Sequence, residues 1–547
     1  MAAGRGHGVK SVPLIAAALM LHLVLIQPNH PGAMTWGALL AFPLELPAIL
    51  LALLTLGRSW AGQALRVGVT LALTSLAVLK TADFVSFTAL SRGFNPVTDL
   101  SLIDAFARLL TGALGVGMAI VVGIAAVLAM GLVALLLWWA TGVWSGLRRS
   151  RPARLATAPL ALMASGVAGA EVGHTMNRWT LPYDPAGAAF TARVGVERLE
   201  LIRDTRARLA AFDAAAAQDP FTNTTGLFAA IDRDVLVIFI ESYGRTSFDT
   251  PLYAETHRAT LSAAEARLSD LGLAMQSGFM TSPTQGGQSW LAHTTFANGL
   301  WVDNQISHAA ALASGRETLY HHAAANGFRT ATLMPQITLD WPESAVMGFE
   351  DILVAADTGY AGLPFNWVTM PDQYTLATLD RLLRDGSDPR RLFVQVALVS
   401  SHAPWTPVPD LLPWEAITDG TEFNSMAQAG DPPEVVWRDH DRVRDQYRLA
   451  IDYSLQVVFE YAALHAETPP LIIAVGDHQA AGFIALDERA EVPIHVIGPE
   501  ALVSRLGALA PSPGLLPPDE AEAIGMETAR DILLTAFRAD AAAELGQ

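Results

Sequence analysis

The chain of 547 residues contains no cysteine, and only 16% of its residues are charged. Without cysteine there are no disulfide bonds, so any exported part must take its stability from the size of its hydrophobic core. A share of 51% hydrophobic residues makes the chain too apolar for an ordinary soluble protein of this length. The composition therefore predicts a part that lies in a membrane.

The excess of apolar residues sits almost wholly before residue 175. The apolar stretches run over residues 13–27, 33–56, 67–79, 112–144 and 155–170. A membrane-spanning helix needs about 20 apolar residues, so the second and fourth stretches are long enough alone and the others need their flanking residues. We expect five spans, with four as the alternative. Arg5 and Lys10 before the first stretch would also suit a cleaved signal peptide, but the four later stretches favour an uncleaved anchor.

Basic residues fall on one side of a five-span arrangement, and the intervening loops are poorer in them. These residues are Arg5, Lys10, Arg58, Arg66, Arg148, Arg149, Arg151 and Arg154. Because cytoplasmic loops carry the excess of Lys and Arg, the amino terminus is predicted to be cytoplasmic and everything after Ala170 to lie outside.

Charge divides along the same boundary. Residues 1–174 hold 11 Lys and Arg against 5 Asp and Glu, whereas the remainder holds 24 against 48. A part this acidic is a poor binder of nucleic acid, because the phosphate backbone would repel it. We therefore expect no nucleic-acid partner.

Glu45 lies inside the second apolar stretch, between Pro43 and Pro47. An ionisable group at the bilayer centre costs about 2.5 kcal/mol or more, so Glu45 should face other helices or a water-filled cavity. It is either a satisfied polar contact between helices or part of a lipid or proton path. The flanking prolines favour the contact.

The chain is predicted to divide into a transmembrane domain (1–174), connector helices (175–228) and an exported catalytic domain (229–547). Residues 186–218 are rich in Ala, Arg and Glu and are typical of a helix. Beyond Asp232, apolar runs alternate with helical patterns, which favours a doubly wound α/β sheet. The expected strands are Val235–Ile240, Arg329–Leu333, Leu392–Val399, Leu471–Val475 and Pro493–Ile497.

Two of these runs end in residues that carry chemistry. DVLVIFI is followed by Glu241, and PLIIAVG is followed by Asp477 and His478. Ligands of open α/β sheets sit in the crevice beyond the carboxyl ends of the strands. Two carboxylates and an imidazole at that edge predict a divalent-metal site, and hence metal-assisted chemistry on a phosphate or sulfate ester.

Four motifs carry a resemblance to a known family. In chain order they are IESYGRTS (240–247), GGQSWLAHTTFANG (286–299), VSSHAPW (399–405) and VGDHQ (475–479). Their order and spacing resemble the sulfatase-like branch of the alkaline phosphatase superfamily. With the preceding spans, the chain looks like the membrane-bound phosphoglycerol and phosphoethanolamine transferases of the lipoteichoic acid synthase type. The resemblance covers the chain to about residue 500 and implies an α/β/α sandwich after the helical bundle.

The resemblance implies a role for each motif residue. Glu241, Asp477 and His478 would bind one divalent metal ion, and Mn²⁺, Zn²⁺ and Mg²⁺ all suit this set of donors. Ser289 would be both the fourth ligand and the nucleophile, since a serine hydroxyl needs a metal to stabilise its alkoxide. His402 would donate to a phosphoryl oxygen or protonate the leaving group.

Some positions stay open. Thr284 is the reserve nucleophile, although Ser289 stands ten residues before Gly299, as the catalytic position does in formylglycine sulfatases. The same alignment of Ser289 with the catalytic position puts His293 where those enzymes carry an arginine. Trp341 fits the tryptophan of the substrate pocket, but Glu343 stands where a basic residue is expected.

Two departures from the family pattern bear on the activity. The chain has no cysteine and no Ser-x-Pro-x-Arg at Ser289, which disfavours a formylglycine sulfatase. The phosphoglycerol transferases usually have threonine as nucleophile, whereas this chain offers serine.

The expected function is transfer of a phospholipid head group, phosphoglycerol or phosphoethanolamine, to a glycan or lipid acceptor through a phospho-Ser/Thr intermediate. One alternative is a hydrolase that uses water as acceptor, a phosphodiesterase or phosphatase. Another is an inactive scaffold that binds a head group, which the complete set of ligands argues against. The expected location is a bacterial cytoplasmic membrane, with several spans in the bilayer and the catalytic domain on the periplasmic or extracellular side.

Overall fold

The computed structural model of the protein describes residues 11–90, 92–147, 150–182, 185–339, 341–366 and 369–539. Its chain forms two compact units, which we call the helical unit (Met1–Thr88 and Arg92–Arg208) and the α/β unit (Ala89–Ser91 and Leu209–Gln547). The predicted domain boundaries at residues 174 and 228 stay a prediction. Of the basic residues used for orientation, Arg5, Lys10, Arg148 and Arg149 lie outside the described residues.

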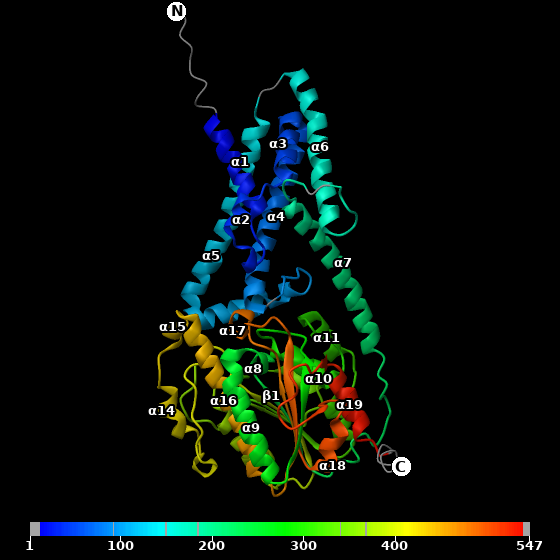
Figure 1. Cartoon of the computed structure of the whole chain (residues 1–547), viewed down its shortest axis with the longest axis vertical. Coiled ribbons are helices and arrows are strands. Elements are labelled where there is room, and N and C mark those ends of the chain that lie inside the picture. The colour runs from blue at the N-terminus through cyan, green and yellow to red at the C-terminus, as the bar shows by residue number, and fades with distance from the viewer. Residues whose placement is uncertain are drawn as a thin grey trace, which may run out of the picture. The chain divides into compact units, whose positions relative to one another are not determined.

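The helical unit contains long apolar helices (Figure 1). Its helices are α1 (Ser11–Ile26), α2 (Trp36–Leu40), α3 (Glu45–Leu56), α4 (Trp60–Leu90), α5 (Ile103–Ser145), α6 (Arg151–Thr175) and α7 (Phe190–Ala216), the last continuing into the α/β unit. Within the described residues, three segments are long and apolar enough to cross a membrane: Trp60–Leu90, Gly115–Ser145 and Pro152–Thr175. Helices α1 and α3 are apolar but shorter, so length and composition support three of the five predicted spans.

The single span predicted for residues 33–56 is wrong, because two helices occupy this stretch. Helix α2 ends at Leu40 and α3 begins at Glu45. Pro43 lies between the two helices; inside a helix it would remove a hydrogen bond, because proline has no backbone N–H. Pro47 lies in the first turn of α3, where proline is tolerated. Glu45 therefore opens a helix instead of lying in the middle of one.

The structure contains the polar contact between helices expected for Glu45. Its buried Oε1 accepts the backbone N–H of Ala192 at 2.9 Å, and Oε2 of Glu171 accepts the N–H of Ala189 at 2.9 Å. Both amides belong to the start of α7, where unpaired N–H groups and the helix dipole favour negative charge. Two carboxylates from α3 and α6 thus hold the amino-terminal end of α7.

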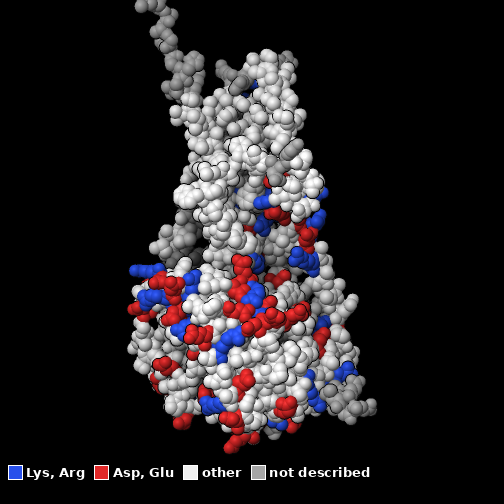
Figure 2. Space-filling model, in the orientation of Figure 1, with Lys and Arg blue, Asp and Glu red and all other residues white. Residues whose placement is uncertain are grey.

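Two of the basic residues used for orientation contact the ends of neighbouring helices in this unit. Arg66 donates to the carbonyl of Trp138 near the end of α5 at 3.1 Å, and Arg154 lies against Gly57 in the turn between α3 and α4. On the face that Figure 2 shows, much of the surface of the helical unit is uncharged, whereas Asp and Glu are spread over the surface of the α/β unit. That these helices cross a membrane, and in which direction, stays a prediction.

Among the described residues, the α/β unit is built on one mixed sheet of nine strands. They are β1 (Val235–Ile240), β2 (Ala274–Thr281), β3 (Arg329–Met334), β4 (Asp351–Val354), β5 (Leu392–Leu398), β6 (Leu471–Gly476), β7 (Glu491–Gly498), β8 (Ser512–Pro513) and β9 (Ala523–Gly525). Their order is β4-β3-β5-β1-β6-β7-β2-β8, with β9 beside β2. The five predicted strands are confirmed. The doubly wound parallel pattern holds from β4 to β6, but β7 runs antiparallel to both β6 and β2.

Helices cover both faces of this sheet (Figure 1). They are α8 (Thr246–Asp249), α9 (Pro251–Asp270), α10 (Ser289–Asn298), α11 (Gln305–Ala313), α12 (Leu319–Ala325), α13 (Asp372–Leu383), α14 (Asn424–Ala427), α15 (Pro433–Val436), α16 (His440–Leu464), α17 (Gly482–Ala485), α18 (Glu500–Val503) and α19 (Thr528–Ala536). Alternate residues of β1 enter opposite cores: Leu236 and Ile238 pack with α9, α13 and α16, whereas Val237 and Phe239 pack with α10, α12 and α19. The unit is the expected three-layer α/β/α sandwich.

The imidazole of His495 makes the stability of this unit depend on pH. It lies fully buried on β7, where Nε2 contacts the Tyr243 hydroxyl at 3.0 Å and Nδ1 contacts Ser277 Oγ at 2.7 Å. Burial lowers its pKa to about 3. The unfolded chain, with an ordinary histidine pKa of about 6.5, therefore binds a proton that the folded chain does not bind as pH falls through this window.

We predict that acidification from pH 7 to pH 5 destabilises the α/β unit, with about 2 kcal/mol of the loss due to His495. The His495→Gln variant should lose that share of the pH dependence. Hydrogen exchange of β7 amides in the full chain measures it. Exposed His440 supplies the matched control, because His440→Gln makes the same substitution without emptying a buried site. Equal pH dependence in His495→Gln and the wild type would contradict the assignment.

Candidate active site

The register of the sheet brings the two acidic strand ends together. Strand β1 lies between β5 and β6, and its last residue, Ile240, pairs with Gly476 of β6. Glu241 and Asp477 are the next residues on the two parallel strands, so both carboxylates lie at the same edge of the sheet. This is the edge at which α/β proteins bind ligands.

Glu241, Asp477 and His478 form a buried cluster whose ligand atoms all lie within 4.8 Å of one another. Nε2 of His478 is 3.0 Å from Oε1 of Glu241 and 3.9 Å from Oδ1 of Asp477. The Asp477 carboxylate is also fixed by the backbone, because its Oδ1 accepts the N–H of Ser242 at 2.9 Å. The structure thus brings together the three residues predicted as metal ligands.

The hydrogen bond at Nδ1 sets the orientation of the His478 ring. Nδ1 lies 3.0 Å from the carbonyl oxygen of Gln479, which can only accept, so Nδ1 carries the hydrogen. In the neutral ring Nε2 then presents a lone pair toward the carboxylates, and it has no hydrogen-bond partner among the described residues. A metal-binding histidine is held in this way, by a hydrogen bond from its other nitrogen to a carbonyl oxygen.

The cluster requires positive charge. Burial raises the pKa of Asp477 well above its ordinary value, and the charge of Glu241 raises it further. Burial acts in the same direction on Glu241, but the facing His478 imidazolium lowers its pKa overall. The two carboxylates outweigh burial at His478 and raise its pKa to about 9. Either a proton or a cation must balance these acceptors, and two carboxylate oxygens with one imidazole fit a divalent metal ion.

Ser289 lies directly beside the cluster. Its Oγ donates to Oε2 of Glu241 at 2.9 Å, and the side chain is half-buried. The preceding turn has positive φ at Gly286 (74°), Gly287 (144°) and Gln288 (66°), after which Ser289 opens α10. Its hydroxyl therefore lies at a helix amino terminus, where unpaired N–H groups favour an anionic group.

The other candidates on this segment have different surroundings. The buried hydroxyl of Thr284 donates to the carbonyl of Gly287 at 2.6 Å and so stabilises the turn itself. His293 lies one turn after Ser289 on α10 and packs against Phe239, with ring centroids 4.1 Å apart. Burial lowers its pKa to about 4, which keeps the ring neutral. These contacts favour Ser289 over Thr284 as the reactive hydroxyl.

His402 is exposed in the turn that follows β5. The residue before it ties this turn to the cluster, because Ser401 Oγ donates to the backbone carbonyl of Glu241 at 2.6 Å. The positive charge of a protonated His402 also lowers the pKa of Glu241. The exposed His402 is thus close enough to Glu241 to act on its charge.

Trp341 packs against the hydrophobic core of the α/β unit. Its ring contacts Phe349, with centroids 6.5 Å apart, and no hydrogen bond or ring contact within the described residues joins it to the cluster or to Ser289. Glu343 follows in the short helix Pro342–Val346 and interacts with His308 of α11. Their place in a substrate pocket stays a prediction.

Sequence reasoning missed Asp372, which holds the turn of His402. Its buried Oδ1 accepts the N–H groups of Val399 and Ser400 at 2.7 and 2.8 Å, and its Oδ2 accepts the hydroxyl of Ser454 at 2.6 Å. Burial raises its pKa in spite of these bonds. In the sequence, Asp372 is an acidic residue at a helix start, which gives no sign of this contact.

Comparison with known proteins gives structural similarity alone. No family model matches the chain, and no curated protein matches it. Among solved structures it is similar to several bacterial proteins. The lipoteichoic acid synthase LtaP from Listeria monocytogenes shares 13% identity at a TM-score of 0.33, over 53% of this chain and 72% of that chain.

The second is the periplasmic domain of the phosphoethanolamine transferase EptC from Campylobacter jejuni, at 12% identity and TM-score 0.35, over 56% and 89% of the two chains. The third is the Streptococcus pyogenes phosphoglycerol transferase GacH in complex with sn-glycerol-1-phosphate, at 13% identity and TM-score 0.33, over 62% and 92%. The resemblance inferred from the motifs is thus found again among solved structures. At these identities and scores it carries no argument about function, which we take from the side chains.

Proposed function

We propose that the protein is a membrane-anchored, metal-dependent phosphotransferase that moves a phospholipid head group to a glycan or lipid acceptor. One observation carries the proposal: the Ser289 hydroxyl donates to Glu241 at 2.9 Å, and Glu241 belongs to the buried cluster with Asp477 and His478. A nucleophile that shares a carboxylate with a cation site is suited to attack on phosphorus.

Each side chain has a separate task in this reaction. Glu241, Asp477, His478 and Ser289 would hold one divalent ion (Mn²⁺, Zn²⁺ or Mg²⁺), whose charge would stabilise an ionised serine hydroxyl. Glu241 Oε2 orients the Ser289 proton, and the amino terminus of α10 faces the anionic phosphoryl group. His402, exposed on the solvent side, donates to a phosphoryl oxygen or protonates the leaving group.

The helical unit supports a lipid donor. Three described segments are long and apolar enough to cross a bilayer, where phosphatidylglycerol and phosphatidylethanolamine would be available as substrates. The α/β unit is then on the periplasmic or extracellular side of a bacterial cytoplasmic membrane, as the basic residues predict. The head group transferred is phosphoglycerol or phosphoethanolamine.

A labelled-lipid assay on the full chain in detergent tests this function. Phosphatidylglycerol or phosphatidylethanolamine, labelled in the head group, is supplied with one metal at a time and with or without candidate glycans. We expect release of diacylglycerol that stops on chelation and returns with added metal.

The fate of the label separates the remaining functions. Label on the glycan supports a transferase, whereas free head-group phosphate in the presence of glycan replaces the transferase with a hydrolase. No release from either lipid, together with no bound metal in the purified protein, would overturn both in favour of a scaffold.

A further inference from the structure

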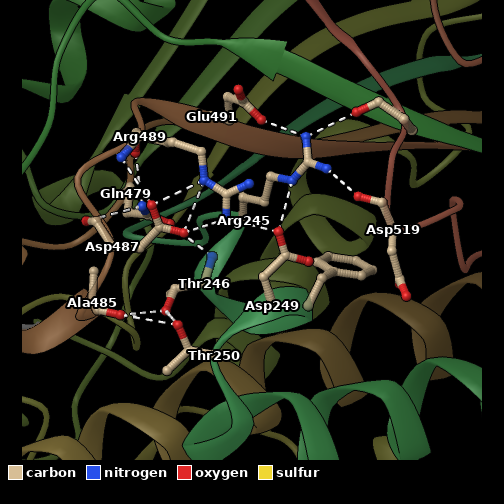
Figure 3. Close-up of polar contacts among 12 residues, drawn as sticks. Arg245, Thr246, Asp249, Thr250, Gln479, Ala485, Asp487, Arg489, Glu491 and Asp519 are labelled. Carbon is tan, nitrogen blue, oxygen red and sulfur yellow. Dashed lines mark hydrogen bonds and ion pairs between the residues drawn. The ribbon is translucent and has the colours of Figure 1, made fainter.

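Three segments far apart in the sequence supply the candidate ligands, and all three meet at Gln479. Gln479 directly follows His478 in the chain. Its backbone carbonyl accepts the N–H of Gly286, in the turn before Ser289, at 2.8 Å. Its side-chain Oε1 accepts the N–H of Thr246, in the turn after Glu241, at 2.8 Å (Figure 3).

The other end of the Gln479 amide is also bonded. Nε2 donates to the carbonyl of Arg489 at 2.7 Å, in the segment that leads into β7, and the residue is fully buried. The side chain therefore accepts at one end and donates at the other. Only an amide does both, because a glutamate would set an oxygen against the Arg489 carbonyl and a methionine would leave both partners unpaired.

The turn after Glu241 is shaped to receive this side chain. A Cβ on Gly244 would lie 2.3 Å from Oε1 of Gln479 and 2.7 Å from its Cβ and Cγ. The backbone of Gly244 does not have positive φ, so glycine is needed there for space and not for conformation. The Gln479 side chain thus packs directly on the backbone that follows Glu241.

Arg245 fixes the same turn from the other side (Figure 3). Its Nε contacts Asp249 at 3.1 Å, its Nη1 contacts Glu491 at 2.5 Å, and its backbone N–H donates to the carbonyl of Glu491 at 2.9 Å. Arg245 therefore anchors the turn after Glu241 to β7. The Gln479 side chain sets the distance between this turn and the segment that carries Asp477 and His478.

We propose that Gln479 is a positioning residue for the cation site, and that its side-chain amide fixes Glu241 relative to Asp477, His478 and Ser289. The inference rests on the metal site of the proposed function. Groups behind the ligands of metal sites typically change metal affinity 10- to 100-fold when they are altered.

The test measures metal affinity in the full chain in detergent, after the metal is stripped and Mn²⁺, Zn²⁺ or Mg²⁺ is titrated back against a competing chelator. The Gln479→Met variant keeps the length of the side chain and should bind the metal about 10- to 100-fold more weakly. Gln373→Met is the matched control. The Gln373 amide likewise makes two backbone bonds, to Leu412 at 2.7 and 2.9 Å, but it holds none of the three ligand segments, so affinity should be unchanged.

The Gly244→Ala variant disturbs the same contact, between Gly244 and the Gln479 side chain, without changing Gln479 itself. It should weaken metal binding to a similar degree, because the new Cβ displaces the Gln479 side chain. In the double variant Gly244→Ala with Gln479→Gly the clash is gone, because glycine at position 479 has no Cβ. The combined loss should then be smaller than the sum of the losses in Gly244→Ala and Gln479→Gly measured singly.

The outcomes separate the two proposals. A wild-type chain that binds none of the three ions would overturn the metal site itself and the proposed function with it. Wild-type binding with unchanged affinity in Gln479→Met, or additive losses in the double variant, would overturn the role of Gln479 alone. If Gln479→Met does not fold, Gly244→Ala and the double variant still decide the question.

Discussion

Replacing Ser289 with alanine is expected to lower head-group release by about 10³-fold or more, the size of loss seen when a nucleophile is removed. The bound metal should stay, because Glu241, Asp477 and His478 keep three of the four proposed ligands. The assay is diacylglycerol release from labelled phospholipid, with metal content measured on the same sample. The Ser289→Thr variant should recover part of the activity, since it restores a hydroxyl at the same position.

Thr284 provides the comparison for this variant. Its hydroxyl bonds to the carbonyl of Gly287 at 2.6 Å, so Thr284→Val should loosen the turn and cost about one power of ten or less. If Thr284 were the nucleophile, the two variants would exchange their effects. Mass spectrometry of the trapped phospho-enzyme gives a direct reading, with the added phosphoryl group expected on the peptide that holds Ser289. Full activity of Ser289→Ala would remove Ser289 from the mechanism.

Arg530 should show the largest effect on stability. Its guanidinium is completely buried and binds Asp219 through two bonds, at 2.9 and 3.0 Å, and it also donates to the carbonyl of Glu317 at 2.8 Å. The Arg530→Met variant leaves the Asp219 carboxylate buried without its partner. We expect the α/β unit to lose about 3 to 5 kcal/mol of unfolding free energy.

Hydrogen exchange of the α19 amides in the full chain measures this loss. The exposed pair of Arg442 and Asp431 is the control, because Arg442→Met should change stability by less than about 1 kcal/mol. A second variant, Arg530→Met with Asp219→Leu, removes both charges and should be more stable than Arg530→Met alone. Equal losses in Arg530→Met and Arg442→Met would show that the buried pair contributes no more than a surface one.

The strands that deliver the candidate ligands could be predicted because their signals are local. Val235–Ile240 and Leu471–Gly476 are short apolar runs that end at polar residues, and central parallel strands have this pattern since both faces are buried. Strand β2 (Ala274–Thr281) was missed. Its sequence, AMQSGFMT, mixes polar residues and a glycine with apolar ones, and its place beside β7 depends on a partner more than 200 residues away.

The stretch of residues 33–56, predicted as one span and found as two helices, shows that local sequence signals are limited in the helical unit as well. Composition identifies residues 33–56 as apolar, but hydrophobicity alone does not say whether the helix is continuous. Pro43 and Pro47 decide where α3 can begin, and the bonds from Glu45 and Glu171 to the start of α7 exist only after distant helices have packed.

The amino-acid sequence alone determined that this chain has an apolar helical part and an acidic α/β part, and which side chains stand at the ends of β1 and β6. These features follow from composition and from periodicity over a few residues. Only the tertiary structure decided that Ser289 reaches Glu241, that Asp372 holds the turn of His402, and that Gln479 joins three ligand segments. Each of these is a hydrogen bond between residues distant in the chain, and such bonds form only when the whole sheet and its helices are in place.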